Sequence, residues 1–181
     1  MSRVPLINPA STTANRRAIL GSINKAFGAT PNMFRAVAHS PAALQSMWGA
    51  FGALGSGVLG AKLGEQIAVA IAERNRCEYC LAAHTVLGKG AGVSAEDMSA
   101  AQAGRSSDPQ TAAALAFALK VVSNRAHLVD EDFAALRAVG FDDEYIVEIV
   151  AHVALNIFTN YINVALDVPV DFPKVALNPV A

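Results

Sequence analysis

Charged side chains are scarce in this sequence. Asp, Glu, Lys and Arg make up 16% of the 181 residues, and the formal net charge is −1. So weak a charge gives no electrostatic attraction to nucleic acid or to an acidic membrane surface, and neither is expected as a partner. Hydrophobic residues make up 53%, so we expect the folded chain to expose apolar area, as oligomer subunits do. The composition therefore predicts a homo-oligomer.

A secretory signal and a clear membrane span are also missing. The amino-terminal sequence MSRVPLINPASTTANRR has no apolar run followed by a small-residue cleavage site, which predicts a cytoplasmic protein. Residues 36–61 contain no Asp, Glu, Lys or Arg, but Pro41, Gln45 and several glycines interrupt them. The apolar part is shorter than the roughly 20 residues that a spanning helix needs. We interpret this segment as a buried or subunit-facing helix.

Strand signals are rare and alanine is abundant, so we expect one all-α domain over residues 1–181. The expected helices cover residues 13–27, 31–41, 41–54 and 64–75, then restart at the first cysteine and near residue 94, and continue at 109–124, 130–139 and 142–166. Residues 168–179 are too rich in proline for a helix and should wrap over a neighbouring element. Asn75 is the expected left-handed cap at which the chain turns back into an antiparallel helical hairpin.

The chain has only two cysteines, Cys77 and Cys80, and they lie with His84 in the stretch CEYCLAAH. Attachment of a c-type haem is excluded because Leu81, not histidine, follows the second cysteine. A structural zinc ion needs four ligands, and the hairpin adds only His84 and Glu65 to the pair, which disfavours zinc. Two readings remain open, namely inert cysteines packed as small hydrophobic residues and a redox-active dithiol.

The spacing favours the redox interpretation. Cysteines at positions i and i+3 lie on one face of a helix, close enough for a disulfide. At a helix start, the first-turn N–H groups and the helix dipole lower a thiol pKa. His84 follows Cys80 by one turn and can accept its proton. In the predicted hairpin, Glu65 returns beside His84, where a carboxylate orients the imidazole and raises its basicity.

These residues resemble a known family motif. Glu65, eleven intervening residues, the Cys77-x-x-Cys80 pair and His84 resemble the core motif of AhpD-like alkylhydroperoxidases within the carboxymuconolactone decarboxylase superfamily. PNMFRAVAHSP, residues 31–41, resembles the superfamily's amino-terminal segment. NYINVALDVPVDFP, residues 160–173, resembles the end of its peroxidase-related branch.

The resemblance implies an all-helical bundle that forms obligate oligomers, typically trimers or hexamers, and uses no metal, haem or other cofactor. It implies that Cys80 attacks a peroxide substrate, that Cys77 resolves the product to a disulfide, and that an external dithiol reduces it. Glu65 and His84 match the positions of the proton relay.

Tyr79 departs from the family pattern, which has histidine directly before the second cysteine. A phenol with a pKa near 10 cannot act as a base at neutral pH. Two roles stay open for Tyr79, a hydrogen bond to the thiolate or peroxide and aromatic packing against the hairpin.

Three functions therefore compete. The first is a thiol peroxidase that uses Cys77, Cys80, His84, Glu65 and Tyr79. The second is a dithiol redox carrier or oxidative-stress sensor without peroxidase turnover. The third is an oligomeric helical scaffold with inert cysteines.

A second polar feature lies near the carboxyl terminus. Glu148, His152, Asn156 and Asn160 recur every four residues in an otherwise apolar helix, and Asn163 lies close to the same line. This spacing places them on one helix face. Because unpartnered burial costs about 1 to 3 kcal/mol for each group, we expect them to meet polar groups, and we favour a subunit contact over a substrate pocket.

Overall fold

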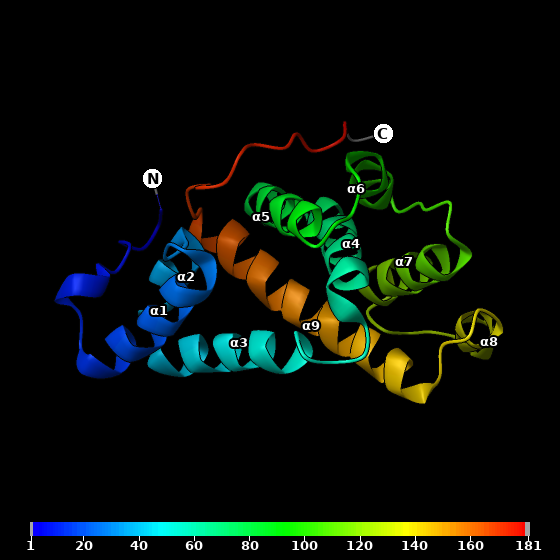
Figure 1. The fold of residues 1–181 in the computed structure, drawn as a ribbon, viewed down its shortest axis with the longest axis horizontal. Helices are drawn as coiled ribbons and strands as arrows, with labels where there is room; N and C mark the ends of the chain where they lie inside the picture. The colour runs from blue at the N-terminus through cyan, green and yellow to red at the C-terminus, as the bar shows by residue number, and fades with distance from the viewer. Residues whose placement is uncertain (1, 180–181) are drawn as a thin grey trace.

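The computed structural model describes residues 2–179, which form helices and contain no β-strand (Figure 1). This confirms the all-helical fold. A short 3₁₀ helix at Pro9–Ser11 precedes nine α-helices in the described part of the chain. They are α1 (Ala14–Phe27), α2 (Asn32–Val37), α3 (Pro41–Leu54), α4 (Gly60–Arg74), α5 (Glu78–Gly90), α6 (Ala95–Gln102), α7 (Pro109–Ser123), α8 (Asp130–Ala138) and α9 (Asp143–Leu166).

Several helices begin where the sequence supplies capping chemistry. The side chains of Ser40, Ser94 and Asp108 each accept a hydrogen bond from the backbone N–H three residues further on, at the starts of α3, α6 and α7. Pro41 and Pro109 occupy the first positions of α3 and α7, where their missing N–H leaves no bond unmade. These local signals explain why the predicted starts of these three helices agree with the structure.

Three details differ from the sequence prediction. The helix α2 ends at Val37, before the serine that caps α3, and α4 begins at Gly60 rather than near residue 64. Asn75 is not the left-handed residue, since its φ is −87°, whereas Arg76 has a φ of 55°. The Asn75 side chain instead donates a hydrogen bond of 3.0 Å to Asn160 of α9. Asn75 is thus the C-cap of α4, as predicted, but without the left-handed conformation, and its side chain makes a long-range contact.

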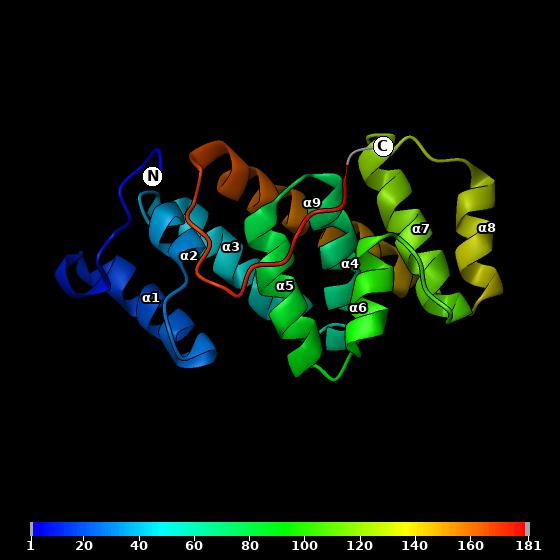
Figure 2. The same cartoon turned by 90° about the horizontal axis from the view of Figure 1, so that it is seen from above.

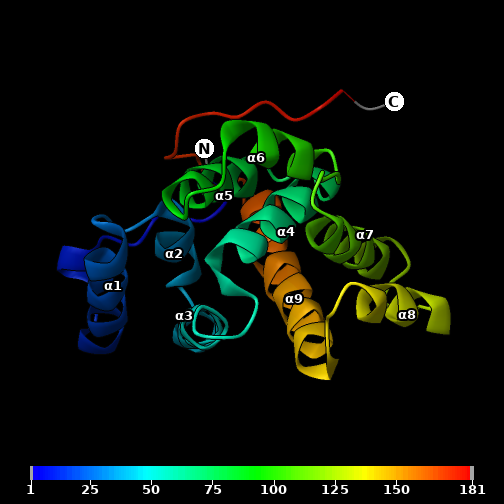
Figure 3. The same cartoon turned by 45° about the vertical axis from the view of Figure 1, so that its right-hand side comes forward.

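The long helix α9 runs through the middle of the fold and contacts α2, α3, α4, α5 and α7. In Figures 1 and 3, α1 to α3 lie at one end of α9 and α7 and α8 at the other, while α4 and α5 cross its middle. By length and composition α9 is also apolar enough to cross a membrane. Its inward face, however, holds the buried amides of Asn156, Asn160 and Asn163.

The segment after α9 is non-helical and wraps over the hairpin, as predicted. Figure 2 shows it running along α5 toward the side of α6. Gln102 of α6 donates a hydrogen bond of 2.9 Å to the carbonyl of Ala176, and the backbone N–H of Asn178 lies 3.2 Å from Glu73 of α4. These bonds to α4 and α6 hold the carboxyl-terminal segment over the hairpin, whose second helix, α5, begins at the cysteines.

Candidate active site

The helices α4 and α5 form the predicted antiparallel hairpin, and it brings two predicted site residues together. Oε2 of Glu65 lies 2.7 Å from Nδ1 of His84. The side chains are 21% and 11% exposed, so the ion pair is largely shielded from water. Because Glu65 faces Nδ1, the other ring nitrogen, Nε2, is left to exchange a proton with a neighbour.

The two cysteines lie at the start of α5. Cys77 is the N-cap residue, and its sulfur accepts a hydrogen bond of 3.2 Å from the backbone N–H of Cys80. The two residues form a disulfide, with their Cα atoms 5.3 Å apart. Both are almost fully buried within the chain. The structure thus confirms a CxxC pair at disulfide distance, placed where a helix N-terminus stabilises a thiolate.

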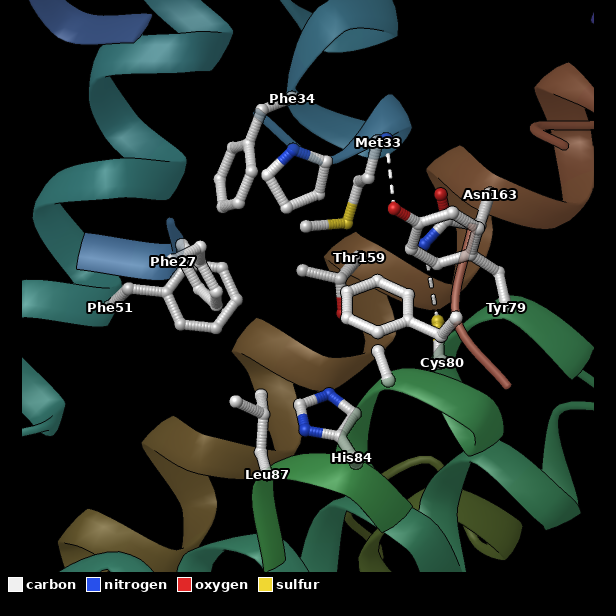
Figure 4. Close-up of a pocket in the computed structure, with 13 residues that line it drawn as sticks. Phe27, Met33, Phe34, Phe51, Tyr79, Cys80, His84, Leu87, Thr159 and Asn163 are labelled. Atoms are coloured by element: carbon white, nitrogen blue, oxygen red, sulfur yellow. Dashed lines mark hydrogen bonds between the residues drawn. The ribbon is translucent and has the colours of Figure 1, made fainter. Parts of the chain in front are cut away.

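Cys80 and His84 open onto one apolar cavity of about 30 Å³ between α2, α3, α5 and α9 (Figure 4). Its other walls are mainly aromatic and aliphatic side chains, namely Phe27, Pro31, Met33, Phe34, Phe51, Tyr79, Ala83, Leu87 and Phe172, with Thr159 and Asn163 as the polar members. A carboxyl-terminal residue, Phe172, therefore contributes to this cavity although it is distant from the cysteines in sequence.

Asn163 is a site residue whose contact with sulfur the sequence reasoning missed. Its Nδ2 donates a hydrogen bond of 3.2 Å to Sγ of Cys80, and its side chain is buried (Figure 4). A donor at this distance favours the charged form of the sulfur once the disulfide is reduced. The signal was the row of polar residues in α9, of which Asn163 is the last.

The subunit contact predicted for that row is wrong. Asn156, Asn160 and Asn163 are all buried against other helices of the same chain. The carboxylate of Glu148 accepts hydrogen bonds of 2.9 Å from the backbone N–H groups of Val58 and Leu59 at the start of α4. The row faces inward because its side of α9 packs on the hairpin.

The hydroxyl of Tyr79 is directed at α2 rather than at the sulfur atoms. It accepts a hydrogen bond of 3.2 Å from the backbone N–H of Met33 (Figure 4). Its ring packs edge-on against Phe172, with centroids 5.7 Å apart. Burial raises the pKa of Tyr79 strongly, the Met33 N–H opposes this, and the Asp171 carboxylate adds to the rise. This geometry fits the packing role that the sequence left open.

Among the described residues, no group of three or more His, Cys, Asp and Glu side chains lies close enough to hold a metal ion. Glu65 and His84 face each other, and the two sulfur atoms are bonded together. The side chains that could bind a metal therefore form an ion pair and a disulfide instead.

Comparison with known proteins places this site in context. Residues 40–124 match the carboxymuconolactone decarboxylase family. This region includes Glu65, both cysteines and His84. A comparison with curated proteins returned no match.

Solved structures resemble the whole chain. One is an uncharacterized peroxidase-related protein from Ralstonia eutropha JMP134, described as an alkylhydroperoxidase AhpD core, with 27% identity and a TM-score of 0.86 over 94% of this chain and 92% of that one. A peroxidase-related protein from Silicibacter sp. TM1040 has 22% identity and a TM-score of 0.81 over 97% and 92%. A variant of the debrominase Bmp8 in complex with 2,3,4-tribromopyrrole has 24% identity and a TM-score of 0.79 over 94% of each chain.

The family match covers the cysteine hairpin, and the peroxidase-related structures extend the likeness over nearly the full length. The two comparisons therefore agree for the hairpin and for the helices around it. Residues 40–124 match the carboxymuconolactone decarboxylase family, and the fold of the chain is AhpD-like.

Proposed function

We propose that this protein is a thiol peroxidase that reduces hydroperoxides through a dithiol–disulfide cycle of Cys77 and Cys80. The main support is one arrangement, in which Cys80 and His84 share an apolar cavity while Glu65 holds the far side of the imidazole. An apolar cavity keeps a thiolate poorly solvated and reactive, and the ion pair supplies a base and acid beside it.

In the first step, His84 takes the thiol proton of Cys80. The thiolate attacks the O–O bond of the hydroperoxide, so that an S–O bond forms and the O–O bond breaks. The departing alkoxide receives the proton held on Nε2 of His84 and leaves as an alcohol. Asn163 stabilises the thiolate before attack, and Cys80 becomes a sulfenic acid.

In the second step, the sulfur of Cys77 attacks that of Cys80. An S–S bond forms, the S–O bond breaks, and the hydroxide leaves as water with the thiol proton of Cys77. The two thiols have then supplied the two electrons that reduce the peroxide. An external dithiol returns those electrons by thiol–disulfide exchange and restores both thiols.

The cavity size favours a peroxide over a larger substrate. A volume of about 30 Å³ accommodates about two water molecules or a peroxide group. A substituted aromatic ring such as the tribromopyrrole bound to Bmp8 would require the aromatic walls to move apart. Reductive debromination is therefore the competing activity, and an assay for released bromide tests it.

One experiment separates the proposal from its two rivals. Steady-state consumption of hydroperoxide with a dithiol reductant, lost in Cys80→Ser, supports the peroxidase. Fast reversible oxidation of the pair without turnover supports the redox carrier or stress sensor. If neither thiol alkylates faster than a free-cysteine peptide at neutral pH, both redox functions fail, and the helical scaffold with inert cysteines is the remaining function.

A cycle that ends in free thiols requires a reducing compartment, so the proposed location stays the cytoplasm.

We also propose that the chain forms a homo-oligomer through the outer face of α9. Apolar side chains on that face follow one another at alternating steps of three and four residues, which is the spacing of a coiled-coil seam. They are Val147, Val150, Ala154, Ile157, Tyr161 and Val164. Val147, Tyr161 and Val164 are 67%, 61% and 49% exposed. A seam of this kind matches a second copy of itself, and trimers or hexamers remain the expected assemblies.

A further inference from the structure

A second cavity lies on the other side of His84 from Cys80. It has a volume of about 130 Å³ and is lined by parts of α3, α4, α5 and α9. Its polar members are Glu65, His84, His152 and Asn156. His84 lines both cavities, so the imidazole borders the apolar space at the sulfur and this larger space with its four polar side chains.

Two buried atoms in the second cavity lack a hydrogen-bond partner among the described residues. They are Nε2 of His152 and Oδ1 of Asn156. Asn156 is only 5% exposed, and its Nδ2 already donates to the carbonyl of His152 at 2.9 Å. Leaving such groups unpaired destabilises the folded chain. The cavity that these residues line has room for several water molecules.

The charged groups around His152 come from three helices. Glu148 of the same helix lies 3.9 Å from Nε2, which is beyond hydrogen-bond distance, and Glu65 and His84 face the ring from α4 and α5. Burial lowers the pKa of His152, while the two carboxylates and the Leu54 carbonyl oppose this and His84 adds to it. A neutral imidazole has one donor and one acceptor nitrogen, so it can pass a proton through water.

We propose that the second cavity is the proton entrance of the active site, in which water held by His152 and Asn156 carries protons between solvent and the Glu65–His84 pair. The inference rests on the proposed dithiol–disulfide cycle. His152 acts as a positioning residue, since it reaches the sulfur only through water, Glu65 and His84. The arrangement supplies protons without admitting water to the apolar cavity of Cys80.

The proton balance of the reductive step creates the need for this path. An external dithiol attacks as a thiolate, so its proton remains in bulk solvent. Attack on Cys77 forms a mixed disulfide and releases Cys80 as a buried thiolate. An unprotonated Cys80 thiolate attacks that mixed disulfide and reverses the step. Protonation of Cys80 by His84 blocks this reversal, and His84 must then regain a proton from solvent.

The test follows reduction of the Cys77–Cys80 disulfide by excess dithiothreitol in stopped flow. His152→Gln retains a polar group but cannot exchange protons, and we expect net reduction to slow at least about tenfold. Added imidazole should restore the rate. His127→Gln makes the same chemical change at an exposed loop residue and should leave the rate unchanged.

A second variant guards against an indirect effect. His152→Phe fills part of the cavity, so it should slow reduction without rescue by imidazole, while a normal thermal melt shows that it folds. Reduction of both variants at the wild-type rate overturns the inference, as does a slow His152→Gln variant that imidazole does not rescue. If the disulfides of the wild type and the His152 variants are reduced at the expected rates but the wild type consumes no hydroperoxide, the peroxidase proposal fails and the proton entrance stands.

Discussion

Oε2 of Glu65 lies 2.7 Å from Nδ1 of His84, although 19 residues separate them in the chain. The hairpin of α4 and α5 creates this contact, and a carboxylate in this place stabilises the imidazolium that forms when His84 takes a proton. The proposed chemistry depends on that charge, and the first prediction removes it.

Glu65→Gln keeps the size of the side chain but removes its charge. We expect kcat for hydroperoxide reduction to fall about 10²-fold, because the imidazolium of His84 loses its counter-ion. Glu73→Gln is the matched control, since Glu73 lies on the same helix and binds Gln102 and Asn178 instead of His84. Steady-state kinetics measures both variants. A Glu65→Gln enzyme within twofold of wild type contradicts the assigned role.

Asn163→Leu removes the hydrogen-bond donor to Cys80. A hydrogen bond to a charged group contributes about 1.5 to 3 kcal/mol, and 1.36 kcal/mol corresponds to one pKa unit. We therefore expect the pKa of the reduced Cys80 thiol to rise by about one to two units.

The pH dependence of iodoacetamide alkylation measures this pKa. Asn160→Leu deletes the same type of buried amide from the same helix, but Asn160 bonds to Asn75 rather than to sulfur. The control should lose stability and keep the thiol pKa. Equal alkylation profiles for Asn163→Leu and wild type would show that the amide does not act on the thiolate.

Tyr79→Phe tests whether the phenol takes part in chemistry. The hydroxyl bonds to the Met33 N–H, so we expect the peroxidase rate to stay within about twofold. The free energy of unfolding should fall by about 1 to 3 kcal/mol because a buried N–H loses its acceptor. Thermal melts and kinetics give the two values. A folded variant with a large rate loss would assign the hydroxyl to the reaction.

His152 also makes the stability depend on pH. Burial lowers its pKa from the usual 6.5, so near that pH the unfolded chain binds a proton that the folded chain does not. The free energy of unfolding therefore falls as the pH drops below about 6.5, until the folded imidazole is itself protonated. In thermal melts between about pH 8 and pH 5, His152→Gln should lose less stability than wild type. Parallel curves of stability against pH for the variant and the wild type would contradict a buried neutral imidazole at His152.

The oligomer prediction concerns the outer face of α9. Val150→Glu places a charge in the apolar seam and should shift the protein toward smaller species in sedimentation or light scattering. Val129→Glu is the control, because Val129 is 55% exposed but lies outside that face. The same mass for both variants and the wild type would exclude this seam as the contact.

Local chemistry made much of the site predictable. Capping residues and prolines located most helix starts, and the break predicted at Asn75 indicated the hairpin that brings Glu65 to His84. The sequence did not reveal which way α9 faces, because its outer side is apolar too and gives no contrast. For this reason the contact of Asn163 with sulfur was missed.

Asn75 is the C-cap of α4, as predicted, but it is not left-handed, and its long-range partner was not foreseen. Its amide bonds to Asn160, 85 residues further along the chain, and no local rule contains that partner. Phe172 likewise reaches the cavity only because the carboxyl-terminal segment wraps over α5. Contacts between distant segments, rather than secondary structure, were the part that sequence reasoning could not supply.

The most direct test of the peroxidase proposal is a single turnover. Reduced protein is mixed with an equivalent amount of an organic hydroperoxide in the absence of reductant, and the alcohol and protein thiols are quantified together. The proposal predicts that alcohol appears in step with the Cys77–Cys80 disulfide, that Cys77→Ser stops at a sulfenic acid, and that Cys80→Ser forms no alcohol. A reduced, reactive Cys80 that leaves the hydroperoxide intact would contradict it.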